Sequence, residues 1–101
     1  MKPYVIGDEA EKELIAALVY HDIHWGDSGR DLHTELLAAF EAISRTPAAF
    51  PDAGFGNRML ILEDLPFVIY FFDQPHRVWI NAIANAKQRY GYWRKRRPPQ
   101  D

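Results

Sequence analysis

The sequence predicts an α+β domain with the element order β-α-α-β-β-β, in which a helical hairpin packs on a small antiparallel sheet. Residues 9–46 carry apolar side chains at three- and four-residue steps, the period of amphipathic helices. Residues 58–84 hold three short apolar runs separated by turn residues, a pattern typical of strands. The 101 residues have room for one domain, residues 1–101, which ends in a short helix or tail over residues 85–101.

The first strand and helix are expected at the start of the chain. Residues 4–6 form a short β-type run, and Asp8 is the predicted N-cap of a helix over residues 9–25. Acidic residues in its first turns suit the positive end of the helix dipole. The predicted core-facing stripe of this helix consists of Ala10, Leu14, Ala17, Leu18, His21 and Trp25.

A second helix follows after a polar, glycine-containing interruption. Ser28 and Asp31 resemble a capping box, and Pro47 marks the end of the helix. Its predicted apolar stripe consists of Leu32, Leu36, Leu37, Phe40 and Ile43. Because the link is only about four residues, the two helices should run antiparallel.

The second half of the chain reads as a loop and three strands. Two prolines and two glycines predict a loop over residues 47–57. Strands are expected over residues 58–62, 67–72 and 78–84. The strand at 67–72 is apolar at nearly every position, so it should lie in the centre of the sheet, buried on both faces.

Charge is distributed unevenly along the chain. Residues 1–86 hold six Lys and Arg against thirteen Asp and Glu, a net charge of −7, whereas residues 87–101 hold six against one, or +5. Proteins that coat nucleic acid usually spread positive charge over a face. Here it forms one small patch, which can steer docking to an anionic surface.

Several kinds of site are disfavoured by composition. Without cysteine there are no disulfides or thiolate metal sites, which fits a reducing cytoplasm. No apolar run is long enough to span a bilayer, so no membrane association is expected. His21 and His24 share neighbouring helical faces, but no third and fourth ligand is specified, so neither a metal nor another cofactor is expected.

Four features of the second half resemble the RelE/ParE toxin superfamily. Arg58 opens a strand, residues 65–70 read Leu-Pro-Phe-Val-Ile-Tyr, a strand ends in Ala-Ile-Ala at residues 82–84, and residues 92–96 read Tyr-Trp-Arg-Lys-Arg. The preceding helical hairpin has the length and position found in that family. The resemblance therefore covers nearly the whole chain.

The resemblance implies the toxin of a type II toxin–antitoxin pair, a class often described as plasmid stabilisation proteins. Such toxins inhibit growth and are neutralised by a cognate antitoxin whose amphipathic segment wraps the hairpin and sheet. ParE-like members inhibit DNA gyrase, and RelE-like members cut mRNA in the ribosome. A homodimer or a toxin–antitoxin hetero-oligomer is compatible with this reading.

Departures from the family pattern favour the ParE-like function over RNA cleavage. Phosphodiester cleavage needs cations for the developing charge as well as a general base and acid. The sheet positions that supply cations in RelE-like nucleases align here with Leu60, Phe67 and Ala86. The remaining weak candidates for catalysis are Arg58, Arg89 and Tyr92, so an enzyme is less expected than a binding protein.

The tail supplies the expected target-binding residues, which are Tyr92, Trp93, Arg94, Lys95 and Arg96. Two alternatives remain open at this stage. Trp93 can instead close the edge of the core, because tryptophan is usually mostly buried. The protein can also be a non-toxic interaction module that keeps the toxin fold.

Overall fold

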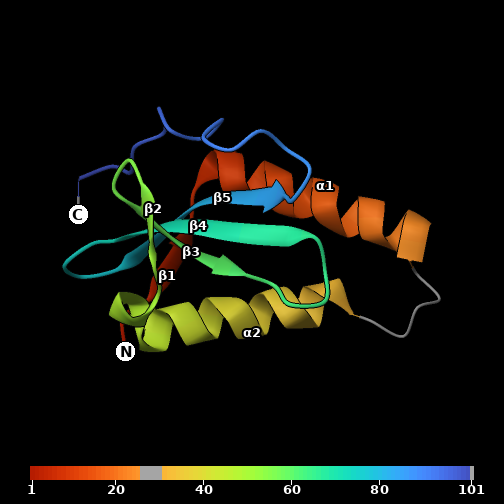
Figure 1. The fold of residues 1–101 in the computed structure, drawn as a ribbon. Coiled ribbons are helices and arrows are strands. Elements are labelled where there is room, and N and C mark those ends of the chain that lie inside the picture. Colours follow the sequence, from red (N-terminus) through yellow and green to blue (C-terminus); the bar gives the residue numbers. More distant parts are fainter. Residues whose placement is uncertain (26–30, 101) are drawn as a thin grey trace.

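The computed structural model describes residues 1–25 and 31–100 and has the α+β class expected from the sequence (Figure 1). Two helices pack on a sheet of five strands. In chain order the elements are β1 (Tyr4–Ile6), α1 (Asp8–Trp25), α2 (Leu32–Arg45), the 3-10 turn η1 (Pro47–Ala49), β2 (Asp52–Gly54), β3 (Asn57–Ile61), β4 (Phe67–Asp73) and β5 (Val78–Asn85).

The sheet is mixed, with the strand order β1-β5-β4-β3-β2. β3, β4 and β5 are antiparallel neighbours as predicted, and β4 lies in the centre. β1 pairs parallel to β5, with Tyr4 opposite Val78 and Ile6 opposite Ile80. The parallel pairing follows because the whole helical hairpin and three strands separate β1 from β5 in the sequence.

β2 lies within residues 47–57, where the sequence predicts only a loop. It is three residues long and pairs with the start of β3, Asp52 opposite Arg58 and Gly54 opposite Asn57. The turn between them has positive φ at Gly54, Phe55 and Gly56. A strand this short carries too little β-type sequence to be recognised, so the prediction of a plain loop was wrong here.

The main core lies between the sheet and the two helices, which run in opposite directions (Figure 1). Alternate residues of β4 face the helices: Phe67, Ile69 and Phe71. On β5, Ile80 and Ile83 face the same way although they are three apart. The extra residue is a bulge, because Tyr70 pairs with Ala82 while Phe71 pairs with Ile80.

The helix ends differ from the prediction in detail. Asp31 caps α2, its Oδ1 accepting the Thr34 N–H at 3.2 Å, and these Thr34 hydrogen bonds hold the pKa of Asp31 below its usual value. Ser28 lies outside the described residues. α1 begins at Asp8, and the Glu11 N–H donates to Gly7 O at 2.8 Å, so Gly7 holds the place predicted for Asp8.

The opposite face of the sheet is covered in part by the chain after β5, which forms a series of turns (Figure 1). The amides of Tyr92, Arg94 and Arg96 each donate to a carbonyl three residues earlier. A second, smaller core forms there from five buried residues, namely Ala53, Tyr70, Ala82, Ala84 and Trp93. Both faces of β4 are therefore buried, as its apolar sequence predicts.

Candidate functional site

Trp93 is the centre of the second core. Its side chain has no exposed surface, and its ring lies 4.2 Å from Tyr70, 5.6 Å from Tyr90 and 6.0 Å from Phe55 between centroids. The last two contacts are edge-on, a preferred arrangement of aromatic pairs. Trp93 thus belongs to the core in this conformation, so its assignment to a target-binding surface needs correction.

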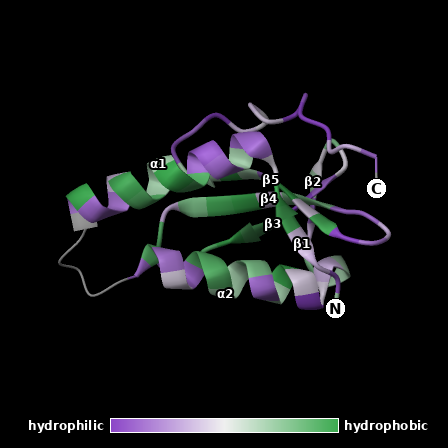
Figure 2. Ribbon diagram, turned by 180° about the vertical axis from the view of Figure 1, so that it is seen from behind, coloured by the Kyte–Doolittle hydropathy of each residue, from purple (hydrophilic) through white to green (hydrophobic). Residues whose placement is uncertain are grey.

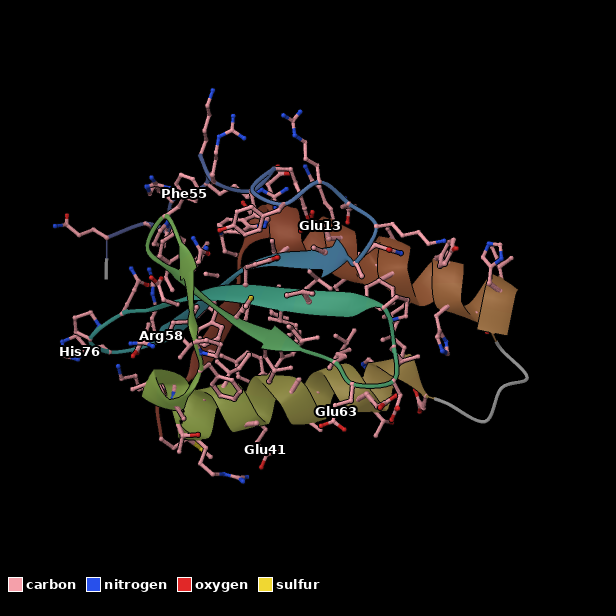
Figure 3. All side chains as sticks on the ribbon, in the orientation of Figure 1. Glu13, Glu41, Phe55, Arg58, Glu63 and His76 are labelled. Carbon is pink, nitrogen blue, oxygen red and sulfur yellow. The ribbon has the colours of Figure 1, made fainter. Side chains whose placement is uncertain are left out.

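Glu13 on α1 holds the tail in place (Figure 3). Its carboxylate accepts the Tyr92 hydroxyl at 2.6 Å and two hydrogen bonds from the Arg96 guanidinium, at 2.9 and 3.2 Å. The Ile83 N–H donates to the same carboxylate at 3.1 Å. Only 18% of the Glu13 side chain and 24% of the Arg96 side chain are exposed. Helix, sheet and tail therefore meet at one partly buried carboxylate.

Sequence reasoning missed Glu13, because it was counted only among the acidic residues that favour the helix start. A signal was nevertheless present. Glu13 lies three residues after Ala10 and four before Ala17, both of which are buried. On a helix these spacings share one face, so Glu13 falls within the core-facing stripe and needs a partner there.

The five predicted target-binding residues divide into two groups. Tyr92 and Arg96 turn inward to Glu13, and the Arg96 guanidinium lies 5.2 Å from the centre of the Tyr92 ring. Arg94 and Lys95 are exposed. Of the predicted set, these two present the accessible surface in this conformation.

The weak catalytic candidates are not assembled into one site. Arg58 donates from Nη1 to the carbonyl of Phe50 at 2.7 Å, which ties β3 to the segment after α2. Tyr92 is bound to Glu13 instead, and Figure 3 places Arg58 well away from Glu13. Arg89 is exposed on the turn after β5.

Two of the positions aligned with catalytic cations face the main core. Phe67 is buried in the main core and Leu60 packs against it, so both point toward the helices. On the opposite face, β3 and β4 carry Met59, Ile61 and Val68, of which Ile61 is 61% exposed. The accessible part of that face is therefore apolar, whereas Tyr70 on the same face is buried beneath the tail.

Tyr92 is held in its neutral form. Burial, followed by the hydrogen bond to the Glu13 carboxylate, raises the pKa of Tyr92 above its usual value near 10. An unfolded chain would ionise this phenol at the usual value and release its proton. We therefore expect the free energy of unfolding to fall as pH rises above about 10, because the unfolded state then binds fewer protons.

The measurement is urea unfolding at pH 9 and 11. Tyr92→Phe should show a smaller loss of stability between these pH values than the wild type, because Phe has no phenol to ionise. Equal pH slopes in the two proteins would contradict the assignment. Absorbance at 295 nm, which follows tyrosine ionisation, should show that the variant lacks one tyrosine that ionises only at unusually high pH in the wild type.

α1 carries a second apolar stripe on its outer side. Ile15, Val19 and Ile23 recur every four residues and are 56%, 55% and 72% exposed, and neighbouring Tyr20 is 40% exposed. Figure 2 shows hydrophobic (green) colour along the C-terminal part of α1. Three members of the predicted core-facing stripe, Ala10, Ala17 and His21, are indeed buried. The outer apolar stripe was not predicted. Leu37, assigned to the core of α2, is 44% exposed as well.

A shallow groove of about 260 Å³ adjoins this helix. Its walls are formed by α1, the ends of β4 and β5, and the turn after β5. The lining residues are Glu13, Ala16, Ala17, Tyr20, Phe67, Ile83, Asn85 and Gln88. Most of the lining is apolar, so the groove and the outer stripe together form an extended apolar surface.

Two further sequence expectations can be set beside the structure. Within residues 1–25 and 31–100, no three His, Asp or Glu side chains lie close enough together to hold a metal ion. His21 is buried, and His24 stacks on Tyr20 with 4.2 Å between ring centroids. Neither helix in the described part of the chain is long and apolar enough to cross a membrane.

Comparison with known proteins adds a structural likeness. No protein-family model matches the sequence, and no curated protein matches it either. The fold is similar to that of a solved structure described as the chromosomal ParDE toxin–antitoxin system from P. aeruginosa, with a TM-score of 0.73 and 18% sequence identity. The match covers 86% of this chain and 98% of that chain. It confirms the RelE/ParE-like fold expected from the sequence motifs.

Proposed function

We propose that this protein is the toxin of a type II toxin–antitoxin system, of the ParE-like kind, that inhibits growth by binding an essential target such as DNA gyrase. The observation that carries the proposal is the likeness to a ParDE chain over nearly that chain's full length. The tail motif at residues 92–96 supports it independently. A fold alone does not determine function, so the proposal needs a direct test.

Binding is favoured over RNA cleavage by the character of the exposed sheet face. Met59, Ile61 and Val68 offer no group that could stabilise a pentavalent phosphate or transfer a proton. The acidic body of the chain would also be repelled by ribosomal RNA. We therefore propose that the chain acts by binding a target and not by cleaving RNA, and that it uses no cofactor.

The test is induced expression of the chain without a partner, followed by growth curves. We expect growth arrest that is relieved when a cognate antitoxin, sought as a small reading frame beside the gene, is co-expressed. A supercoiling assay with purified gyrase should then show inhibition, while primer extension should show intact transcripts. Cleaved transcripts would point to the RelE-like alternative, and normal growth at high soluble yield would point to a non-toxic module.

The outer stripe of α1 is the surface that we assign to the antitoxin. Large exposed apolar patches on small proteins usually mark interaction sites, and Ile15, Val19 and Ile23 have the four-residue spacing that receives an amphipathic helix. Exposed carboxylates flank the stripe at Glu11 and Asp22. The antitoxin segment should accordingly carry apolar anchors with basic neighbours.

Val19→Arg should weaken the complex with the antitoxin at least 100-fold, because it places a charge in the centre of the apolar contact. The measurement is isothermal titration calorimetry with the purified antitoxin that relieves growth arrest. Leu37→Arg on α2 is the matched control, since Leu37 is similarly exposed but lies outside the stripe. Equal losses for both variants would argue against a site on α1.

A further inference from the structure

We infer that the β2–β3 turn and the outer side of the tail form one contact surface, and that this surface binds an acidic segment of a protein partner. The surface consists of Phe55, Tyr90, Arg89, Arg94 and Lys95, and we call it the tip–tail surface. It rests on the proposed function, for which it names the contact residues and the chemistry of the partner. Figure 3 shows basic side chains of the tail extending beside Phe55.

Phe55 occupies a backbone conformation that disfavours its residue type, and its contact with the buried Trp93 is only edge-on. Its φ is 55°, between Gly54 at 87° and Gly56 at 82°. A non-glycine residue in this left-handed region costs about 1–2 kcal/mol, and bulky residues are rare there. Half of the Phe55 side chain nevertheless remains exposed. Glycine or asparagine would suit the backbone better, so a large aromatic at this tip points to a contact made with another molecule.

Tyr90 presents a second exposed ring beside the first. Tyr90 is 60% exposed, and its hydroxyl donates a hydrogen bond to the carbonyl of Ala53 on β2. Phe55 and Tyr90 both pack edge-on against the buried Trp93 ring. The two rings are thus held on one rigid base. Side chains that are fixed before binding lose little conformational entropy when a partner docks.

Three cations of the tail segment form no internal ion pair. Arg89, Arg94 and Lys95 are all exposed, and none forms an ion pair with a carboxylate in the described part of the chain. Arg94 donates only to the carbonyl of Gly91, at 3.1 Å. By contrast, Arg96 is fully engaged by Glu13. The tail therefore separates one structural arginine from a set of cations that face solvent.

The surrounding charge selects a protein segment over a nucleic acid. Residues 1–86 carry a net charge of −7, so phosphates that extend beyond the tail would meet an acidic body. Nucleic-acid binding instead requires cations along an extended track. A short run of carboxylates fits three exposed cations within seven residues of one another in the sequence, since arginine pairs with carboxylate in a bidentate manner. Apolar side chains between the carboxylates would pack on Phe55 and Tyr90.

A direct binding assay tests this surface. The probe is a fluorescein-labelled ten-residue peptide of alternating Glu and Leu, and its binding is measured by fluorescence anisotropy at 50 mM salt. A labelled ten-nucleotide thymidine strand is measured in the same way for comparison. The peptide should bind more tightly than the DNA. The double variant Arg94→Glu, Lys95→Glu should weaken peptide binding at least tenfold. Tighter binding of the DNA strand, or no peptide binding at all, would overturn the inference.

Phe55→Asn separates contact from folding. Asparagine tolerates the left-handed region, so the urea midpoint should be equal to or above that of the wild type. Peptide affinity should nevertheless fall at least tenfold. Ile61→Ala is the control, because Ile61 is an exposed apolar residue outside the tip–tail surface, and its affinity should be unchanged. Wild-type affinity in Phe55→Asn would remove the tip from the site.

The cellular readout distinguishes this inference from the proposed function. If the chain is a toxin, Phe55→Asn should lose growth arrest and still bind the antitoxin at α1. If the wild-type chain arrests growth and Phe55→Asn is equally toxic, the tip–tail surface is refuted and the proposed function stands. A wild-type chain that never arrests growth would refute the proposed function, while the peptide assay would still decide whether the surface binds acidic segments.

Discussion

Replacing Trp93 with alanine should destabilise the protein by about 3–5 kcal/mol, the range measured for large aromatic side chains removed from protein cores. Trp93 is completely buried and contacts Tyr70, Tyr90 and Phe55, so its loss leaves a cavity beneath the tail. With five buried residues, the second core has few other apolar contacts to compensate. A small domain has only about 5–15 kcal/mol of stability in total, so we expect the variant to retain the main core alone.

Urea unfolding followed by circular dichroism measures the effect. Ile61→Ala is the matched control, because Ile61 lies on the same face of the sheet but is 61% exposed, and it should change stability by about 0.5 kcal/mol or less. A loss below about 1 kcal/mol in Trp93→Ala would show that the tail contributes little to the fold, contrary to its packing.

Glu13→Gln should have the second largest effect, a loss of about 2 kcal/mol. The substitution leaves the Arg96 guanidinium partly buried without its counter-charge, and removing one partner of a buried pair costs more than the pair contributes. We place the loss below the 3–5 kcal/mol of fully buried pairs because about a fifth of each side chain is exposed. Limited proteolysis should also cut the tail faster in this variant.

The control for Glu13 is an ion pair on the surface of α2. Glu41 and Arg45 are joined at 2.7 Å, but about 60% of each side chain is exposed. Glu41→Gln should therefore change stability by less than about 0.5 kcal/mol. Adding Arg96→Met to Glu13→Gln should recover part of the loss, because the uncompensated charge disappears. If Glu13→Gln and Glu41→Gln behave alike, Glu13 is not the anchor of the tail.

The strongly patterned elements could be predicted from sequence, and the weakly patterned ones could not. β4 is apolar at nearly every position. In a strand, such a sequence is commonly explained by burial on both faces of the sheet. β2 is only three residues long, and the turn that pairs it with β3 contains positive φ at Phe55, which the sequence does not indicate. α1 has apolar residues on two faces, so periodicity alone could not indicate which face would be covered.

The directions of the tail side chains could not be predicted residue by residue. The sequence shows that residues 92–96 are aromatic and basic, yet the direction of each side chain depends on successive turns and on Gly91 with its φ of 83°. Those turns send Tyr92, Trp93 and Arg96 inward and leave Arg94 and Lys95 outside. Glu13 lies about eighty residues earlier in the chain, and only the folded structure brings it to the tail.

The division into two cores also predicts what happens when the tail opens. All buried members of the main core lie before residue 84, so that core contains no residue of the tail. When the tail detaches, Tyr70, Ala82 and Ala84 present a bare apolar sheet face. A molecule with its tail open would therefore be nearly folded and still prone to aggregate through that face.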